Sequence, residues 1–554
     1  MRAYHDGTKH AFNRFARSLG YLDWASQPRP FRSWEGSPVV PLAPRPDAVP
    51  RVRPGTPVTF SALGDAGRPA FVHDEAAVGF LLRHALGLSA WKAFGASRWS
   101  LRVNPSSGNL HPTEAYVVRE ARVWHYAPEV HALEQRCAFD ASAWDRLGLD
   151  PSRALLVGLT SIHWREAWKY GERAFRYCQH DLGHAIAAVR FAAALCGWDA
   201  RVLADWPSAV VAQLLGLDRP DDFFEAEPEE PGCVILIRTA PGPGDAVVDP
   251  EAFAAAVAGG VWFGRASQLS VDHVQWTFID EVAEASRRER LEFEPALADV
   301  RAAARSAEPA TALLDGPPSS GAVPAATADA ATVMLRRRSA VAFDGITWLD
   351  RRPFVRMLTA TLPGRVPFDA WPLDARVHLV LFVHRVRDLP PGVYVLVRRP
   401  ASEPLLRGAL GPVEWTRADD ELPLWRLRGG DCRRLAQRLS CDQAIAADSC
   451  FSLGMLAEFE SGLAVRGPAG YRELFWETGI VGQVLYLQAE VEGVRGTGIG
   501  CFYDDAVHEA LGVSDHSVQS LYHFTVGGAV EDRRLTTEPG YEWERMTPSQ
   551  DAAR

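Results

Sequence analysis

Three short segments of the chain combine small, polar and basic residues in patterns that could bind a flat, charged ligand. The first is SLRVNPSSGNLHPTEAYVV over 100–118, a polar loop ahead of an expected strand; its small and polar residues are Pro105, Ser106, Ser107, Gly108 and Asn109. Small residues let a backbone approach a flat ligand closely, and hydroxyl and amide groups can bond its polar edge. The alternative is an ordinary surface turn before a strand.

The second segment, MLRRRSAVAFDG over 334–345, is basic and could bind a phosphate. Arg337, Arg338 and Ser339 lie near an expected helix start, where guanidinium and hydroxyl groups form charge-assisted hydrogen bonds with a phosphate. The alternative is a solvated basic run.

The third segment, GVRGTGIGCFYDD over 493–505, carries glycines at 496, 498 and 500. Glycines there would let backbone amides face a ring or a phosphate. The run does not match the dinucleotide fingerprint, which needs G-x-G-x-x-G between a strand and a helix. The corresponding stretch of the first half, GWDARVLAD, has no such glycines, so the two halves differ here.

An internal repeat supplies the elements that must position these segments. Arg176, Gly183, Gly197 and Gly216 recur at a constant offset of 296 as Arg472, Gly479, Gly493 and Gly512. Apolar residues follow a helical period around the first of these positions in both copies. Three preserved spacings indicate a duplication, in which a dimer has been tied into one chain.

The expected organisation follows from this repeat and from composition. We expect an aromatic, proline-rich arm over 1–50 and a first domain over 51–245, with strands at 115–118 and 233–237 and a helix over 172–196. A helical connection and an Ala/Pro-rich linker occupy 246–332, the second domain 333–540 and a polar tail 541–554.

Composition excludes several function classes. The net charge of −10, without a long basic run, argues against binding to nucleic acid or an anionic membrane. The eight cysteines show no CxxC pair, which argues against a zinc ribbon or a disulfide scaffold. No apolar stretch reaches 18 residues and the N-terminus has no signal-like apolar region, so we expect a cytoplasmic protein.

Together these segments resemble the nitroreductase family of flavoproteins, and most closely its SagB-type, azoline dehydrogenase-like branch. The resemblance rests on RRSAVAFDG, RVNPSSGNLHPTEAY, WKYGERAFRY, GTGIGCFYDD and LYHFTVGGAVEDRRL, which occur in the family's order and cover both halves. It implies an α+β fold of two fused nitroreductase-like domains, arranged as an intramolecular pseudo-dimer. In family members FMN lies at the subunit interface and draws its contacts from both subunits.

The chain divides the parts of one such site between its halves. The second half carries the residues that the resemblance assigns to the phosphate, the ring and a C-terminal basic group: Arg337, Arg338, Ser339, Gly498, Ile499, Gly500, Arg533 and Arg534. The first half carries the Pro-Ser-Ser loop, Pro105–Asn109, which the second half lacks. We therefore expect one FMN per chain, at the domain interface.

Two departures from the family pattern affect this expectation. The family commonly has a second arginine two residues after the serine, where this chain has Val341, so phosphate binding could depend more on Arg533 or Arg534. A second Pro-Ser-Ser run at 317–321 lies in the expected linker with no strand after it, and we interpret it as unrelated to the site.

Lys169 and Tyr170 are the expected catalytic residues, because a Lys-Tyr pair beside the flavin assists proton removal in azoline-oxidising relatives. A lysine or a tyrosine acts as a base only where burial or a positive neighbour lowers its pKa, and Arg173 could supply that charge. The alternative is that Tyr170 packs at a helix start while Lys169 lies at the surface.

His180 and His184 could bind zinc as an i, i+4 pair, but no third ligand accompanies them. The second copy has Trp476 and Ile480 at these places, so the helix does not require histidine to fold. We expect the two histidines to cap or pack near the flavin pocket, and we expect no metal.

The function that these patterns favour is FMN-dependent, two-electron hydride transfer on a small-molecule or peptide substrate, with NAD(P)H or oxygen as redox partner. The protein would position the substrate while the flavin performs the chemistry. The alternative is a non-catalytic flavin-binding accessory or scaffold protein. A third hypothesis is a flavin-consuming oxygenase of the same fold.

Overall fold

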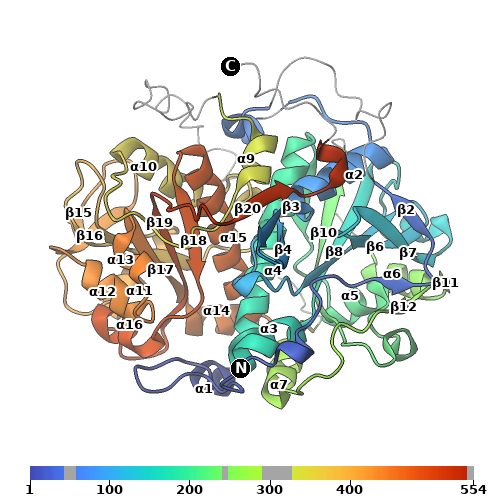
Figure 1. Cartoon of the computed structure of the whole chain (residues 1–554), viewed down its shortest axis with the longest axis horizontal. Helices are drawn as coiled ribbons and strands as arrows, with labels where there is room; N and C mark the ends of the chain where they lie inside the picture. The colour runs from blue at the N-terminus through green and yellow to red at the C-terminus, as the bar shows by residue number, and fades with distance from the viewer. Residues whose placement is uncertain (43–57, 66, 240–247, 290–326, 546–554) are drawn as a thin grey trace.

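The computed structural model describes residues 1–42, 58–65, 67–239, 248–289 and 327–545 (Figure 1). Most of the expected linker over 307–332, the Pro-Ser-Ser run at 317–321 and the end of the tail lie outside the described residues. None of the described helices is both long and apolar enough to cross a membrane.

Each half is built on an antiparallel sheet, and six strands of the two sheets follow the same order, whereas the outermost strands β11 and β15 come from different places in the two halves. The first sheet runs β11 (Val261–Trp262), β7 (Ala132–Ala138), β6 (Arg122–Ala127), β5 (Thr113–Arg119), β8 (Ala154–Ser161), β10 (Glu230–Arg238) and β9 (Asp199–Val202), with β2 (Val39–Pro41) also on β7. The second runs β15 (Thr416–Arg417), β16 (Leu424–Gly429), β14 (Gly392–Leu396), β13 (Val377–Val383), β17 (Phe451–Glu458), β19 (Val518–Gly527) and β18 (Arg495–Ile499).

The helices repeat as well. The bounds of α4 (Ala174–Leu195) and α15 (Gly470–Val491), and those of α5 (Ser208–Leu215) and α16 (Asp504–Leu511), differ by the 296 residues that the sequence repeat predicts. The other helices of six or more residues are α1 (Arg2–Gly7), α2 (Glu75–Ala85), α3 (His163–Tyr170), α6 (Pro250–Ala258), α7 (Thr277–Ala285), α9 (Ala330–Arg336), α10 (Arg351–Ala360), α11 (Glu403–Ala409), α12 (Arg433–Leu439) and α14 (Phe459–Arg466).

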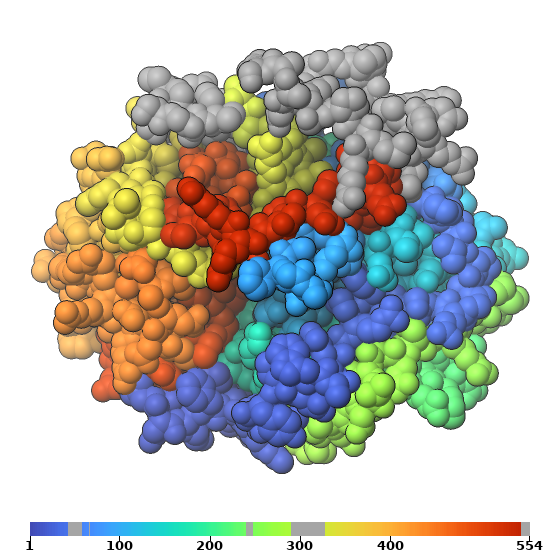
Figure 2. Space-filling view, viewed as in Figure 1, coloured from blue at the N-terminus to red at the C-terminus, as the bar shows by residue number. Residues whose placement is uncertain are grey.

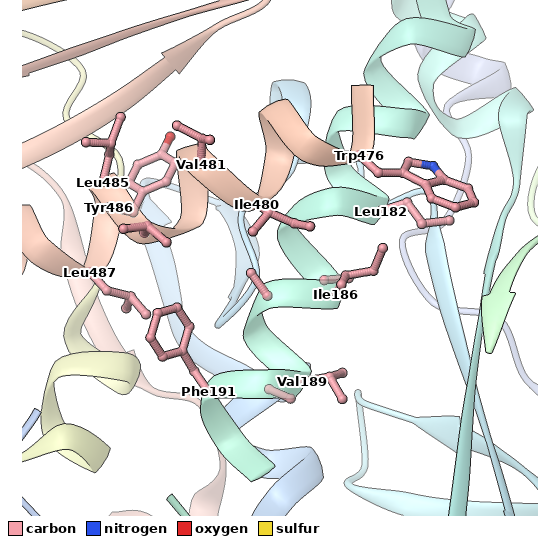
Figure 3. Packing of buried hydrophobic residues seen from close by; sticks show 14 of the residues in the cluster. Leu182, Ile186, Val189, Phe191, Trp476, Ile480, Val481, Leu485, Tyr486 and Leu487 are labelled. Atoms are coloured by element: carbon pink, nitrogen blue, oxygen red, sulfur yellow. The ribbon is translucent and has the colours of Figure 1, made fainter. Parts of the chain in front are cut away.

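Helices α4 and α15 cross at the centre of the molecule, and their crossing explains two repeat glycines. A Cβ on Gly183 would lie 2.2 Å from the Trp476 carbonyl oxygen, and one on Gly479 would lie 2.2 Å from the His180 carbonyl oxygen. Only glycine permits so close an approach of two backbones. Apolar side chains of both helices, among them Ile186 and Ile480, pack along the crossing (Figure 3). The two sheets are thereby held by one shared core.

The other four repeat glycines lie at the ends of helices. Gly216 and Gly512 take left-handed conformations, with φ of 71° and 76°, at the C-caps of α5 and α16. Gly197 and Gly493 follow the long helices and both have φ of 72°. Such backbone conformations favour glycine, so the spacing that the sequence preserves records helix ends and one helix crossing.

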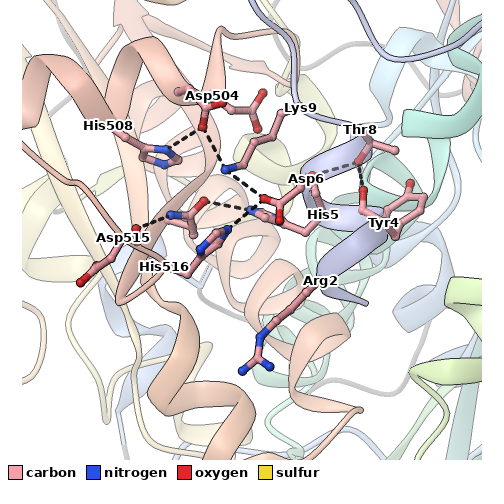
Figure 4. Close-up of polar contacts among 12 residues, drawn as sticks. Arg2, Tyr4, His5, Asp6, Thr8, Lys9, Asp504, His508, Asp515 and His516 are labelled. Atoms are coloured by element: carbon pink, nitrogen blue, oxygen red, sulfur yellow. Dashed lines mark hydrogen bonds and ion pairs between the residues drawn. The ribbon is translucent and has the colours of Figure 1, made fainter.

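Segments from each end of the chain bind the opposite half. Strand β20 (Thr536–Pro539) joins β3 (Leu88–Phe94), which pairs with β4 (Ser97–Arg102), so the C-terminal segment runs across the boundary between the halves (Figures 1 and 2). The N-terminal arm, described over residues 1–42, begins with α1, whose Asp6 lies 2.9 Å from His516 of the second half (Figure 4). Lys9, just after α1, pairs with Asp505 at 2.9 Å.

The expected helical connection is described over residues 248–289, and this part is helical only in places. Helices α6 and α7 are separated by β11 and β12 (Arg265–Ala266), and residues 290–305 lie outside the described chain. Strand β11 extends the first sheet, and α9 begins at Ala330, before the expected boundary at 333. The expected strands at 115–118 and 233–237 fall within β5 and β10.

Candidate active site

A cavity of about 700 Å³ lies between the halves, and residues of both line it. The predicted residues that line it are Pro105, Ser106, Ser107, Gly108, Asn109, Tyr170, Arg337, Arg338, Ser339, Gly498, Ile499 and Gly500. Lys169, Arg533 and Arg534 are not among the lining residues. Strands β3 and β20 contribute Lys92 and Thr537, so the sheet that joins the two halves forms one wall.

The loop Pro105–Asn109, called the serine loop below, is held in place by hydrogen bonds to buried carboxyl groups. The backbone N–H of Ser107 donates to both oxygens of Asp181 at 3.1 Å, and its hydroxyl donates to Oδ1 at 3.1 Å. The Ser106 hydroxyl donates to Glu166 at 3.4 Å and accepts from the His111 N–H at 2.8 Å. In this structure the Ser107 amide and hydroxyl thus bond Asp181, and ligand binding by the serine loop stays a prediction.

Glycine at 108 is required by the same loop. Gly108 has a φ of 61°, and a Cβ there would lie 2.6 Å from the Tyr170 hydroxyl and 3.3 Å from Nζ of Lys169. The loop thus packs directly on the predicted catalytic pair, with the phenol of Tyr170 in the cavity and the exposed Lys169 beside it.

Asp181 and Glu166 are both buried, and neither forms a salt bridge among the described residues. Burial raises the pKa of Asp181 to about 7, against the lowering by its serine donors. Burial, and then the charge of Asp181, raise the pKa of Glu166 well above its ordinary range. Because two adjacent carboxylates repel each other in a low dielectric, this pair holds a proton at neutral pH.

The surroundings of Tyr170 raise its pKa, whereas a base would require a lowered pKa. Burial, followed by the charge of Glu166, raises its pKa well above the ordinary value of 10. Arg173, expected to lower that pKa, instead donates to Asp504 at 2.9 Å and to the Gly500 carbonyl at 3.2 Å. Tyr170 is consequently a hydrogen-bond donor, not a ready proton acceptor.

Arg337 is held by the first half. Its Nε donates to the Val103 carbonyl at 3.1 Å, its Nη2 to the Arg102 carbonyl at 3.0 Å, and its guanidinium lies 5.1 Å from the ring centre of Tyr486. The buried Nη1 has no hydrogen-bond partner among the described residues. Ser339 shares a 2.9 Å hydrogen bond with the Tyr486 hydroxyl.

Arg338 lies close to other arginines, among them Arg337 and Arg495. Its Nη2 donates to the Ser89 carbonyl at 3.0 Å and its Nη1 to the Leu335 carbonyl at 2.8 Å. Burial, and then the charges of Arg337 and Arg495, lower its pKa to about 9. A bound anion would offset the cost of burying the Arg338 charge and its repulsion by the neighbouring arginines. This end of the cavity therefore suits a phosphate.

The glycines at 498 and 500 lie directly against aromatic side chains. The Gly498 N–H donates to the Tyr486 hydroxyl at 2.9 Å, so this amide does not face the cavity as a free donor. A Cβ on Gly498 would lie 1.9 Å from the Tyr522 hydroxyl, and one on Gly500 would lie 2.3 Å from the ring of Tyr177. Glycine leaves room there for aromatic side chains that line the same cavity.

Arg533 and Arg534, which were expected to help bind the phosphate, do not line the cavity. Both are exposed, and Arg534 pairs with its near neighbour Asp532 at 2.7 Å. Its guanidinium lies 5.6 Å from the ring centre of Phe94. A local acidic partner and an aromatic ring hold this arginine outside the cavity, whereas Arg336 and Arg495 line it.

His180 and His184 pack as expected, beside the cavity. His180 lies on the Tyr522 ring, 4.1 Å between centres, and shares a 2.8 Å hydrogen bond with Thr478; His184 lies 3.2 Å from the Tyr522 hydroxyl. In the described part of the chain, the one group of three residues spaced for metal binding does not include these histidines: it is His10, Cys441 and Cys501.

The mirror-related position between the halves is filled. Its void is only about 20 Å³ and is lined by Leu203, Ala204 and Glu473, which correspond through the repeat to the cavity residues Ile499, Gly500 and Tyr177. Trp206, Trp476 and an Arg288–Glu473 ion pair occupy the space. The chain therefore has one open position of the two that its pseudo-symmetry generates.

Several cavity residues were not predicted from the sequence: Tyr177, Asp181, Tyr486, Arg495 and Tyr522. Tyr177 and Asp181 lie on α4, at repeat positions where α15 has Glu473 and Glu477. Divergence between the copies on the faces that meet the cavity was the available signal.

Comparison with known proteins agrees with this fold. The sequence model of the nitroreductase family matches residues 76–226 and 424–528. A nitroreductase-like protein from Anabaena variabilis is 20% identical, with a TM-score of 0.66, over 96% of this chain and 99% of its own. A nitroreductase-like protein from Ralstonia eutropha is 19% identical, with a TM-score of 0.27, over 41% and 97%.

An FMN-dependent nitroreductase from Clostridium difficile is 10% identical, with a TM-score of 0.23, over 38% of this chain and 93% of its own. No curated protein sequence matches the chain. Because its match covers 96% of this chain, the Anabaena variabilis structure shares the fold of both halves.

Proposed function

The chain is built from two nitroreductase-like domains, and we propose that they form one FMN-dependent oxidoreductase site between them. The observation that carries this proposal is the asymmetry of the interface. One position is a cavity of about 700 Å³ that receives the serine loop from one half and the Arg-Arg-Ser segment from the other. Its mirror position retains about 20 Å³. A volume of several hundred Å³ is typical of small-molecule sites.

The residues of the cavity fit a flavin mononucleotide at both of its ends. Arg337 and Arg338 would hold the phosphate, because neither forms an ion pair among the described residues and Nη1 of Arg337 has no hydrogen-bond partner there. Tyr177 and Tyr522 supply aromatic surface for a flat ring next to the glycines of β18. Bound FMN would supply two-electron hydride chemistry.

The roles of the chain's own groups follow from their protonation. Tyr170 keeps its proton at neutral pH and would donate a hydrogen bond to a substrate atom that gains negative charge. Asp181, with a pKa of about 7, exchanges a proton near neutral pH and lies on the cavity wall. Lys169 would act at the rim, beside Tyr170, within the pair that the SagB-type resemblance assigns to catalysis.

The substrate that we propose is a small molecule or a peptide segment that enters beside the β3–β4 hairpin, with NAD(P)H or oxygen as redox partner. The second candidate function is a flavin-binding accessory protein without turnover. It is favoured by the loss of the mirror site, since a lineage that has closed one site can lose catalysis at the other. A flavin-containing protein that transfers no electrons from NAD(P)H to any acceptor would support it.

The test is the flavin content of the purified protein and of two variants from opposite halves. Arg338→Ala removes a phosphate contact, and Ser107→Trp places an indole in the cavity. We expect both variants to lose flavin while circular dichroism shows a folded chain. Arg534→Ala is the matched control, because this exposed arginine lies outside the cavity and should leave flavin content unchanged. Full occupancy in Ser107→Trp would contradict a site shared by the halves.

A further inference from the structure

Two of the eight cysteines differ from the others in their surroundings. Cys441 and Cys501 are half-buried, whereas the remaining six are buried. Burial raises the pKa of Cys137 and of Cys450 to about 12, so thiols of this kind are poorly reactive. Cys441 and Cys501 are therefore the accessible thiols among the eight.

These two thiols are in contact with each other. Their Sγ atoms are 2.7 Å apart although the residues are 60 positions apart in sequence. Cys501 follows Gly500 and lines the cavity. Gln443, close to Cys441 in the chain, donates from Nε2 to the Cys501 carbonyl at 3.1 Å and also lines the cavity.

A strained turn holds Cys441 in this position. Cys441 and Asp442 both have left-handed backbones, with φ of 52° and 58°, although neither is glycine. Asp442 is fixed by Arg438 at 2.9 Å and by the Tyr503 hydroxyl at 3.1 Å. Left-handed backbone in residues other than glycine persists only where the surroundings impose it, and such strain is often found at functional sites.

The N-terminal arm adds an imidazole to the pair. Nδ1 of His10 lies 3.6 Å from Sγ of Cys501. The backbone N–H of His10 donates to Asp504 at 2.9 Å, which fixes the residue against the second half. Burial lowers the pKa of His10, so its ring is neutral at pH 7 and can accept a proton. Arg173 adds a positive charge through its 3.2 Å bond to the Gly500 carbonyl.

The charges make the two thiols unequal. Hydrogen bonds donated by Cys441 and then by His10, together with the charge of Arg173, lower the pKa of Cys501. The same contact raises the pKa of Cys441. One proton is thus retained on Cys441, and the nucleophilic thiolate is Cys501.

We propose that Cys441 and Cys501 form a reversible disulfide, a second redox centre beside the cavity, with His10 as its proton acceptor. A small-molecule disulfide is the oxidant. The Cys501 thiolate attacks one of its sulfurs and releases one thiolate. Cys441 then loses its proton to His10 and attacks Sγ of Cys501, which releases the second thiolate. Two thiols become one disulfide, and the oxidant takes up both electrons.

A divalent soft metal is the competing occupant of the same three side chains. Thiolates that share a tetrahedral zinc each lie about 2.3 Å from the ion, which sets their sulfur atoms well over 3 Å apart. The 2.7 Å contact between these sulfur atoms is shorter than that and closer to a bond length of about 2.05 Å. The geometry therefore favours the disulfide.

The test uses the full chain, with and without added FMN, so that it does not depend on the proposed flavin site. The protein is equilibrated with reduced and oxidised dithiothreitol in varying ratio, and free thiols are alkylated before mass spectrometry. We expect a peptide pair cross-linked through Cys441 and Cys501 under oxidising conditions and its loss under reducing ones. Cys441→Ser and Cys501→Ser should each abolish the cross-link, whereas Cys450→Ser, the matched buried control, should retain it.

The role of His10 has its own readout. In reduced protein, His10→Gln should slow alkylation of Cys501 at pH 7 by roughly tenfold, because the thiolate loses its polar partner. The absence of any cross-linked peptide at every redox ratio would overturn the proposal. Stoichiometric zinc, bound by the wild type and lost in each single cysteine variant, would also overturn it, since it would assign the residues to a metal.

Discussion

The two helices at the centre of the molecule occupy equivalent places but use their carboxylates differently. Asp181 on α4 and Glu477 on α15 correspond through the repeat. Glu477 pairs with the fully buried Arg398 at 2.5 Å and accepts from the Arg376 N–H at 2.9 Å. Asp181 accepts hydrogen bonds from the serine loop and pairs with no cation among the described residues.

The same contrast extends across the interface. On the mirror side, Glu473 pairs with Arg288 and Trp476 fills the space, whereas on the cavity side Tyr177 and Asp181 border an open volume. Duplication thus allows one of two equivalent positions to become structural. The other keeps groups that can bind and exchange protons.

The largest effect should come from the helix crossing that both halves share. Gly183→Ala would place a Cβ 2.2 Å from the Trp476 carbonyl and 2.9 Å from Gly479, both of them backbone. Because the helices must separate, we expect a loss of about 4 kcal/mol or more in the free energy of unfolding, measured in urea. Gly408→Ala, in α11 with open space around it, is the matched control and should be neutral or slightly stabilising. Equal stability of both variants would contradict the shared core.

The equivalent carboxylates provide the next prediction. Glu477→Gln strands the buried charge of Arg398, so we expect a loss of about 3–5 kcal/mol in unfolding free energy. Asp181→Asn removes no ion pair and should cost less than about 1 kcal/mol at pH 7. Similar losses in both variants would show that the two positions are not specialised as the structure indicates.

A substitution of Tyr170 should lower catalytic activity without changing flavin binding. Tyr170→Phe removes a donor in the cavity and should lower NAD(P)H-dependent reduction of a nitroaromatic probe by about 10²-fold or more, with unchanged flavin content. Tyr471→Phe, a buried tyrosine of α15 outside the cavity, should retain activity. Full activity of Tyr170→Phe would remove this residue from the catalytic pair.

The smallest expected effect is a pH dependence of stability. Asp181 has a pKa of about 7 in the folded chain, above the unfolded value near 3.8, so its favourable contribution is complete below pH 4 and is lost as pH rises through 7. Relative to wild type, Asp181→Asn should therefore gain on the order of 1–3 kcal/mol between pH 4 and pH 8. Urea unfolding at these two pH values measures the difference; a constant difference would place the Asp181 pKa near its ordinary value.

Much of the scaffold could be predicted from the sequence because the repeat constrains it. The positions of Gly183 and Gly479, and of Gly216 and Gly512, record a helix crossing and two left-handed helix ends, which are local backbone requirements. Such requirements select one residue type, so the spacing survives where the surrounding side chains differ.

The site could be predicted only in part, because tertiary partners decide what each group does. The Arg-Arg-Ser and Pro-Ser-Ser segments meet in one cavity, as expected. The sequence could not show that Asp532 holds Arg534 outside, that Asp504 takes Arg173 away from Tyr170, or that Asp181 binds the serine loop. These outcomes depend on residues far apart in the chain and on burial, which changes pKa values.

The most direct test of the account is to count flavins per chain by native mass spectrometry of protein saturated with FMN. One open position between two specialised halves predicts one FMN per 554-residue chain at saturation. Two FMN per chain would show that the mirror position is open in solution, and no bound FMN would contradict the site itself.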